Sequence, residues 1–142
     1  MRLLILSCGA TKVKAVGKVR AIDLYDNPLY HSVRRSIREG RTKDIDIYIL
    51  SAKHGLMPFD QLIEWYDLKM DESIADTIRE EVIRKQTEIL KTEYESVFIN
   101  LSEIYLSTMD KSLFPNKWAN QTKYANGPIN KRIGQTKEWV RG

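Results

Sequence analysis

The chain of 142 residues is poor in cysteine, histidine and proline, and each shortage excludes a class of protein. One cysteine cannot form an internal disulfide and fits a reducing compartment, so we expect a cytoplasmic protein. With one Cys and two His, a zinc site would need carboxylate ligands, and we expect neither a metal nor another cofactor. No apolar run approaches the ~20 residues that cross a bilayer, so we expect no membrane partner.

No linker rich in Pro, Gly or Ser divides the sequence, which predicts a single α/β domain over residues 1–142. Short apolar runs typical of buried strands alternate with helical patterns, and this order favours crossover connections. We therefore expect a three-layer α/β/α sandwich around a mainly parallel central sheet. The predicted strands are Arg2–Ser7, Ile45–Ser51 and Ser96–Leu101; the predicted helices run from Asn27-Pro28 to Gly40, over 72–92, over 103–113 and over Pro128–Val140, with 114–126 irregular.

Ligands of such sheets bind beyond the carboxyl ends of the strands, so the segments that follow the strands are the candidate site. After the first strand, Ser7, Cys8 and Gly9 would bring backbone close to a ligand, and Lys12 would supply a cation for phosphate or an oxyanion. Nearby lysines would favour a nucleophilic Cys8 thiolate. The simpler alternative is a small cysteine that only packs at a strand end.

After the second strand, Ser51, Lys53, His54 and Gly55 would place a cation and a titratable imidazole on flexible backbone. An exposed polar loop is the alternative.

A third segment, Ile63–Leu68, holds Glu64, Tyr66 and Asp67. We predict that Asp67 orients water or stabilises an oxocarbenium-like sugar, and the alternative is a loop with solvated acids. Further ligand-binding candidates are Tyr25, Asn100 and Tyr105.

Charge is segregated along the chain. Residues 1–43 contain ten Lys/Arg and three Asp/Glu, residues 44–110 six and fifteen, and residues 111–142 seven and one. Basic ends suit a polyanion, although solvated helix faces would give the same pattern. The predicted nucleic-acid contacts are Lys14, Lys18, Arg34, Arg35 and Arg38.

The motifs SCxxxK, AxDLYxxPLY, YILSAKHGL and IExYDL, followed by GPxxxxIGxxxxW, resemble a family of small bacterial and phage proteins of unassigned function. Cys8 and Lys12 are also similar to the Cys-x-x-x-Lys of a domain of archaeosine synthase, which adds lysine to a 7-deazaguanine base. That resemblance implies a uracil-DNA glycosylase-like fold. The domain has Pro-Tyr after its lysine and this chain has Val13-Lys14, so the fold carries over better than the reaction.

Three functions follow as hypotheses, each with a nucleic acid, nucleotide or modified nucleobase as partner. The preferred one is an enzyme that cleaves or exchanges the N-glycosidic bond of a base in DNA or RNA, with Tyr25 and Tyr66 among the stacking candidates. The second is amine transfer to a 7-deazaguanine nitrile through a Cys8 thioimide. The third is a protein that binds or sequesters a nucleotide without turnover.

Overall fold

The computed structural model describes residues 1–14, 16–118 and 120–142, and its centre is a five-stranded sheet in the order β4-β3-β1-β6-β7. Strand β1 pairs in parallel with β3 and β6, and β6 pairs in parallel with β7. The prediction of three neighbouring parallel strands is therefore confirmed, in a mixed α/β domain. The strands are β1 (Arg2–Ser7), β3 (Ile45–Ser51), β4 (Gly55–Pro58), β6 (Ser96–Asn100) and β7 (Gln121–Tyr124).

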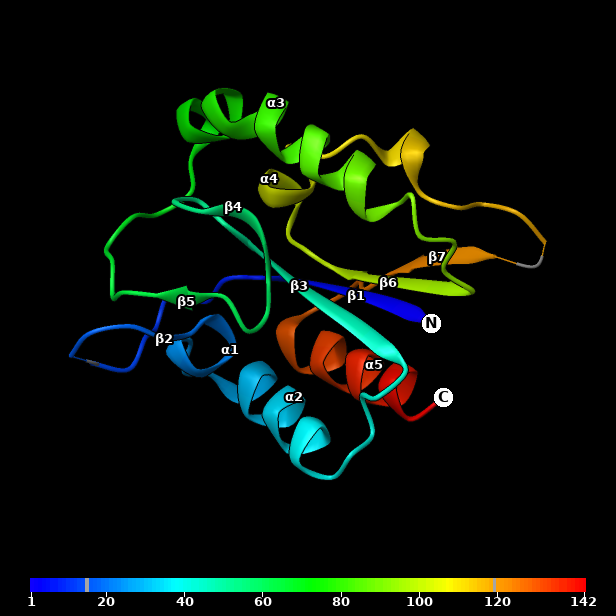
Figure 1. Ribbon diagram of the computed structural model, residues 1–142, viewed down its shortest axis with the longest axis horizontal. Helices are drawn as coiled ribbons and strands as arrows, with labels where there is room; N and C mark the ends of the chain where they lie inside the picture. The colour runs from blue at the N-terminus through cyan, green and yellow to red at the C-terminus, as the bar shows by residue number, and fades with distance from the viewer. Residues whose placement is uncertain (15, 119) are drawn as a thin grey trace.

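Helices α2 (Pro28–Arg38) and α5 (Ile129–Arg141) lie against one face of the sheet, and α3 (Glu72–Ile89) and α4 (Glu103–Leu106) lie against the other (Figure 1). Both faces of β1 are consequently buried. Leu4 and Leu6 belong to one apolar cluster, and Leu3 and Ile5 belong to the other. Each fully buried leucine or isoleucine contributes roughly 1.5–3 kcal/mol, which explains why this strand reads as a continuous apolar run.

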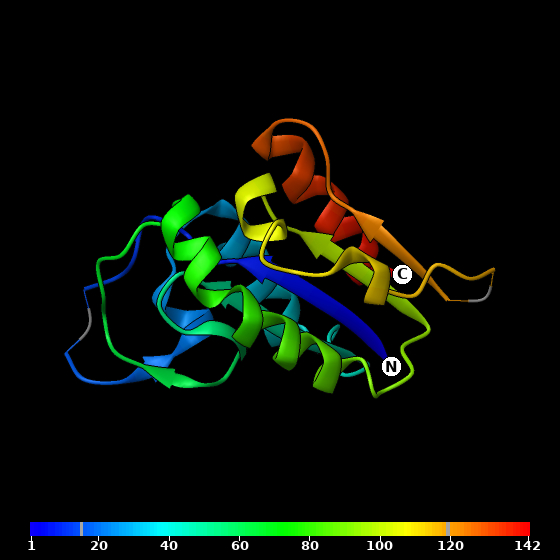
Figure 2. The same ribbon diagram turned by 90° about the horizontal axis from the view of Figure 1, so that it is seen from above.

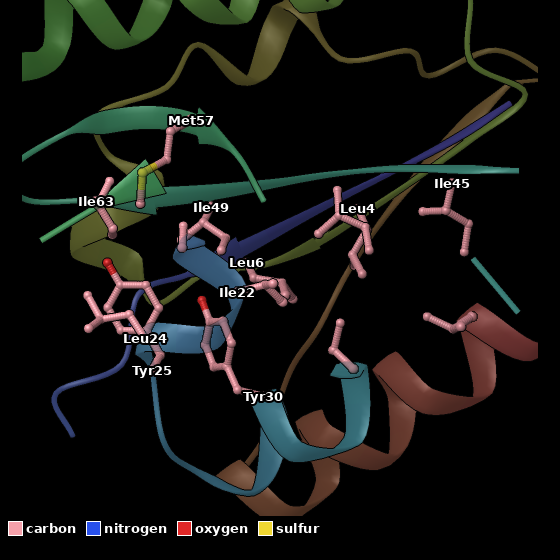
Figure 3. Packing of buried hydrophobic residues seen from close by; sticks show 14 of the residues in the cluster. Leu4, Leu6, Ile22, Leu24, Tyr25, Tyr30, Ile45, Ile49, Met57 and Ile63 are labelled. Atoms are coloured by element: carbon pink, nitrogen blue, oxygen red, sulfur yellow. The ribbon is translucent and has the colours of Figure 1, made fainter. Parts of the chain in front are cut away.

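A small ribbon of β2 (Val19–Arg20) and β5 (Leu62–Ile63) lies at one end of the molecule, with helix α1 (Ala21–Leu24) directly after β2. The two chain termini lie at the opposite end (Figure 2). Because the parallel strands run from the termini toward the ribbon, their carboxyl ends face it. Figure 3 shows Tyr25 and Tyr30 packed beneath the sheet with their hydroxyl ends directed toward it.

The helix signals in the sequence are confirmed at α2. The Asn27 side chain accepts a hydrogen bond from the Tyr30 amide at 3.0 Å, and Gly40 follows the helix with φ +72°. Such a cap satisfies one of the amides that a helix start leaves unpaired. Helix α3 begins at the predicted residue and ends at Ile89, short of the predicted 92.

The predicted helix over 103–113 is wrong in its second half. Helix α4 ends at Leu106, and only a 3₁₀ turn follows, over Lys111–Leu113. The cause is the Gln86 side chain, which donates to the Asp110 carbonyl at 2.8 Å and accepts from the Asp110 amide at 2.9 Å. The second bond occupies the Asp110 amide, which a continuous helix would pair with the Leu106 carbonyl.

Four strands were missed. Two of them, β2 and β5, form the small ribbon outside the main sheet. β7 lies within the segment expected to be irregular, and β4 begins at Gly55, which was expected in a loop. β4 pairs antiparallel with β3, so the sheet is mainly parallel but not wholly so. Within the described parts of the chain, no helix is both long and apolar enough to cross a membrane.

Candidate functional site

The connections of the sheet determine where its crevice lies. From β1 the chain passes through α2 to β3 on one side, and from β3 it passes through α3 to β6 on the other side of β1. The connections thus diverge between β1 and β6, and the crevice at such a point is where α/β sheets bind ligands. A pocket of about 430 Å³ lies there, and its walls include Ser7, Cys8, Gly9, Asn27, Leu29, Tyr30, Asn100, Ser102, Ile129 and Arg132.

A larger cavity, about 710 Å³, lies at the amino ends of the strands. Its side chains are engaged with one another: Phe98 stacks on Trp139 with ring centroids 5.5 Å apart, and the Arg2 guanidinium lies 4.7 Å from the Trp139 ring centroid. We favour the smaller pocket because it is at the strand ends that bind ligands in this class of fold and because it contains the only cysteine.

Cys8 leaves the end of β1 and is half-buried. Its amide donates to the Leu50 carbonyl at 3.0 Å, which fixes the backbone, and its Sγ lies 3.0 Å from the Tyr105 hydroxyl. Burial, followed by the influence of Cys8, raises the pKa of Tyr105 well above its usual value. The phenol is therefore protonated at neutral pH and can donate a hydrogen bond to sulfur.

Tyr66 lies at the centre of a second group of polar side chains. Its hydroxyl oxygen is 2.6 Å from the Tyr25 hydroxyl and 2.8 Å from Ser51 Oγ. Burial raises the pKa of Tyr66 to about 12, with a further contribution from Cys8. Burial also raises the pKa of Tyr25 strongly.

Two lysines and a histidine surround the Tyr66 ring. Lys12 Nζ lies 4.7 Å from the ring centroid and Lys53 Nζ lies 5.7 Å from it. The His54 ring meets Tyr66 edge-on at 5.4 Å. Within the described residues, buried His54 Nε2 has no hydrogen-bond partner, and burial followed by the Lys53 charge lowers the His54 pKa. The imidazole is therefore neutral at pH 7.

Gly9 is required by a close approach. A Cβ atom at this position would lie 2.5 Å from Asn27 Nδ2, the side chain that caps α2. The Asn27 cap and the turn after β1 are therefore closely packed, and this packing holds the start of α2 beside the pocket. Tyr30, in the first turn of this helix, donates its hydroxyl to the Ser7 carbonyl at 2.7 Å.

Asn100 is 6 % exposed and reaches the pocket from the end of β6. Its Nδ2 donates to Thr136 Oγ1 on α5 at 3.1 Å. Arg132 on the same helix donates to the Gly127 carbonyl at 2.8 Å. These bonds fix the wall of the pocket opposite Tyr30.

The structure thus brings many of the predicted site residues together. Ser7, Cys8, Gly9 and Asn100 line the pocket, and Lys12, Tyr25, Ser51, Lys53 and His54 surround Tyr66, while Gly55 begins β4 with φ +66°.

The two predicted acids lie differently. Glu64 and Asp67 are exposed, and no ion pair or side-chain hydrogen bond joins either to another described residue. The catalytic role of Asp67 stays a prediction. Among the described residues there is also no cluster of three or more His, Cys, Asp or Glu that could hold a metal ion.

The predicted nucleic-acid residues do not form one uniform group. Lys14, Lys18, Arg35 and Arg38 are exposed. Arg34 instead donates from Nη1 to the carbonyls of Ile22 and Tyr25, both at 2.8 Å. Arg35 and Arg38 lie in the last turn of α2, away from the helix start that lines the pocket.

Sequence reasoning missed Tyr30 and Thr136 as parts of the site. Tyr30 follows Pro28-Leu29 at the start of a helix, so only its place after the Asn27 cap could have indicated it. Thr136 comes from the last helix, whose position beside β6 depends on tertiary packing.

The sequence was compared with known protein families and with curated proteins. A family described as "Family of unknown function (DUF6884)" matches residues 3–141. The chain belongs to this family. No curated protein matches the chain. The DUF6884 match runs from β1 to the last turn of α5, so it includes every residue of the pocket.

Proposed function

We propose that this DUF6884 chain is a nucleobase-processing enzyme that binds a base, free or within a nucleic acid, in the pocket between β1 and β6. The observation that carries the proposal is the pocket itself. It lies at the divergence of the connections, and its lining combines the side chains of Leu29 and Tyr30 with the polar groups of Cys8 and Asn100. Apolar walls with a few placed polar groups are typical of sites for planar ligands.

The reaction that we propose is cleavage or exchange of the bond between the base and its sugar. The C1′–N bond breaks, the base departs with the electron pair and takes up a proton, and water or another base attacks C1′. Asp67 follows Tyr66 directly and would swing toward the sugar to orient that attack. Lys53 and His54 would face the base or its phosphate.

The fold proposal goes with this function. The five-stranded sheet and its helices support a three-layer α/β/α arrangement of the uracil-DNA glycosylase type. We also propose a cytoplasmic location, which is supported by a single cysteine with no disulfide partner.

A second candidate is amine transfer to a 7-deazaguanine nitrile, and the contact between Cys8 and Tyr105 favours it. The Cys8 sulfur would bond to the nitrile carbon while its proton passes to the nitrile nitrogen, which gives a thioimide. An amine would then displace the thiol. Among the described residues, the pocket walls include a thiol and no carboxylate, which suits this chemistry.

One experiment separates the candidates. The protein is incubated with nucleotides, oligonucleotides and a 7-deazaguanine nitrile, and both products and intact protein mass are followed. Glycosidic turnover should survive Cys8→Ser and fail in Asp67→Asn. A mass adduct on Cys8, together with loss of activity in Cys8→Ser, would contradict glycosidic cleavage and support amine transfer through a thioimide. An intact nucleotide released by denaturation, with no product, would indicate binding without turnover.

A further inference from the structure

Asn100 carries an acceptor atom that the protein leaves free. The residue ends β6, is 6 % exposed and lines the pocket between β1 and β6. Its Nδ2 donates to Thr136 Oγ1 at 3.1 Å, whereas no hydrogen bond joins its Oδ1 to another described residue. Within the described residues, His54 Nε2 is the one fully buried side-chain nitrogen or oxygen without a partner, so Asn100 Oδ1 is open to the pocket. A placed polar atom of this kind selects the ligand group that can bond to it.

Thr136 sets the orientation of the Asn100 amide. Thr136 is 1 % exposed, and its hydroxyl donates its single hydrogen to the Arg132 carbonyl at 2.9 Å, one turn back in α5. The Thr136 oxygen can then only accept, so the group of Asn100 that faces it must be the NH2 group. With the amide turned over, Thr136 could donate to Asn100 or to Arg132 but not to both, and one of the two hydrogen bonds would be lost. Oδ1 is therefore the group that meets a ligand.

Arg132 adds donors beside this acceptor. Its Nε donates to the Gly127 carbonyl at 2.8 Å and its Nη1 to the Leu101 carbonyl at 3.3 Å, which brings the guanidinium next to the residue that follows Asn100. Arg132 also lines the pocket, and no hydrogen bond joins its Nη2 to another described residue. A guanidinium carries several N–H donors and no acceptor. This wall of the pocket therefore combines a fixed acceptor with free donors.

We propose that Asn100 Oδ1 and Arg132 select a lactam base, whose ring carries an N–H group beside a carbonyl as in guanine, hypoxanthine and uracil, and that Thr136 is the positioning residue for Asn100. The ring N–H donates to Oδ1, and the carbonyl accepts from Arg132. Adenine offers an amino group to Asn100 but no carbonyl to Arg132. A site with such groups rejects an analogue that lacks the matching group, because its own polar groups are then left unpaired. This selection rests on the proposed function, since it specifies which base the pocket would hold.

Nucleosides that differ at the ring N–H test the selection. Inosine and uridine carry the N–H and the carbonyl, 1-methylinosine and 3-methyluridine have a methyl group in place of that hydrogen, and adenosine lacks the carbonyl. In isothermal titration calorimetry the wild-type chain should bind inosine or uridine about tenfold or more tighter than its methylated counterpart and adenosine, as expected when a buried acceptor loses its donor. Equal binding of a lactam and its methylated counterpart or adenosine, or no binding of either lactam, would overturn the proposal.

Thr136→Val separates positioning from a simple clash. Valine has a similar shape but cannot accept from Asn100, so the amide can turn over, and the preference for the N–H should fall toward equality. A methyl group that merely collided with the pocket wall would still be disfavoured in this variant. The matched control is Thr87→Val, because Thr87 Oγ1 makes the same bond one turn back, to the Ile83 carbonyl at 2.9 Å, in α3 and outside the pocket. It should keep the wild-type preference.

Asn100→Ala removes the acceptor itself and should weaken lactam binding about tenfold or more, with loss of the preference. A folded Thr136→Val that retained the full preference would refute the positioning role. If either variant fails to fold, the comparison of N–H and N-methyl nucleosides on the wild type decides. Lactam binding with this preference but without cleavage or exchange would refute the proposed enzyme activity alone. Turnover of an adenine base without a lactam preference would refute the selection alone.

Discussion

Tyrosine hydroxyls make many of the hydrogen bonds in the candidate site, whereas the predicted carboxylates of Glu64 and Asp67 are exposed. Burial is the first cause of the raised pKa of Tyr25, Tyr30, Tyr66 and Tyr105. These hydroxyls consequently remain protonated through the physiological range and act as donors. The sequence analysis predicted Tyr25, Tyr66 and Tyr105 as ligand contacts, but not Tyr30. It could not show that the four lie close together, because a tyrosine in a helix or strand has the same pattern as ordinary apolar packing.

Gly9→Ala should lower the free energy of unfolding by about 1 kcal/mol, the usual cost of losing a helix cap. The new Cβ would displace the Asn27 amide, 2.5 Å away, and Asn27 caps α2. Urea denaturation measures this. The control is Gly134→Ala, where a Cβ meets nothing within 4 Å inside α5, and a gain of roughly 0.5–1 kcal/mol is expected. Equal stability of Gly9→Ala and wild type would show that the close approach is relaxed.

His54 should make the protein less stable as the pH falls from about 7 to 5. The pKa of His54 in the folded protein lies below 6.5, the ordinary value of histidine, because of burial and then the Lys53 charge. Below 6.5 the unfolded chain therefore binds more protons at this residue, and stability decreases until the folded pKa is passed. Urea denaturation across this range should show a smaller decrease in His54→Phe. A decrease in His54→Phe as large as in the wild type would contradict this assignment.

At the scale of elements, burial on both faces decided what the sequence could predict. β1, β3 and β6 have apolar, buried centres, and their ranges were predicted to within a residue. β7 reads Gln-Thr-Lys-Tyr and is mostly exposed at the sheet edge, so no hydrophobic period marks it. The break after α4 depends on Gln86, far away in the sequence. The local sequence pattern therefore predicts the interior strands of the sheet. The edge strand β7 and the end of α4 depend on tertiary contacts, which the pattern does not contain.

Arg34→Ala should cost about 1–3 kcal/mol of unfolding free energy, the range for hydrogen bonds to a charged group. Its Nη1 joins α2 to the carbonyls of Ile22 and Tyr25, so the variant loses a link that holds α1 and Tyr25 in place. Arg35→Ala is the matched control: its side chain is 72 % exposed in an ion pair with Glu39, and a change within about 0.5 kcal/mol is expected. Equal effects of the two substitutions in thermal unfolding would contradict this assignment.

At the scale of the whole molecule, the topology places the pocket and the charge distribution suggests what lies around it. Two basic segments of the amino-terminal third, the loop with Lys14 and Lys18 and the helix α2, lie close together. The loop leads into β2 and α1, and α1 packs on α2. Arg35 and Arg38 are exposed at the far end of α2. A polynucleotide in the pocket would therefore have to run along α2 to reach them.

If the partner is a polynucleotide, affinity should fall steeply with salt, since each neutralised phosphate releases counterions. The double variant Arg35→Ala, Arg38→Ala should weaken binding and reduce the slope of log K against log salt by roughly 0.7 per lost contact for a single strand, or about 0.9 for duplex DNA. Arg84→Ala is the control, because Arg84 lies on α3, on the other face of the sheet, paired with Glu81. Binding that does not vary with salt would assign the pocket to a free base or nucleoside, and would leave the basic end of α2 as solvated surface.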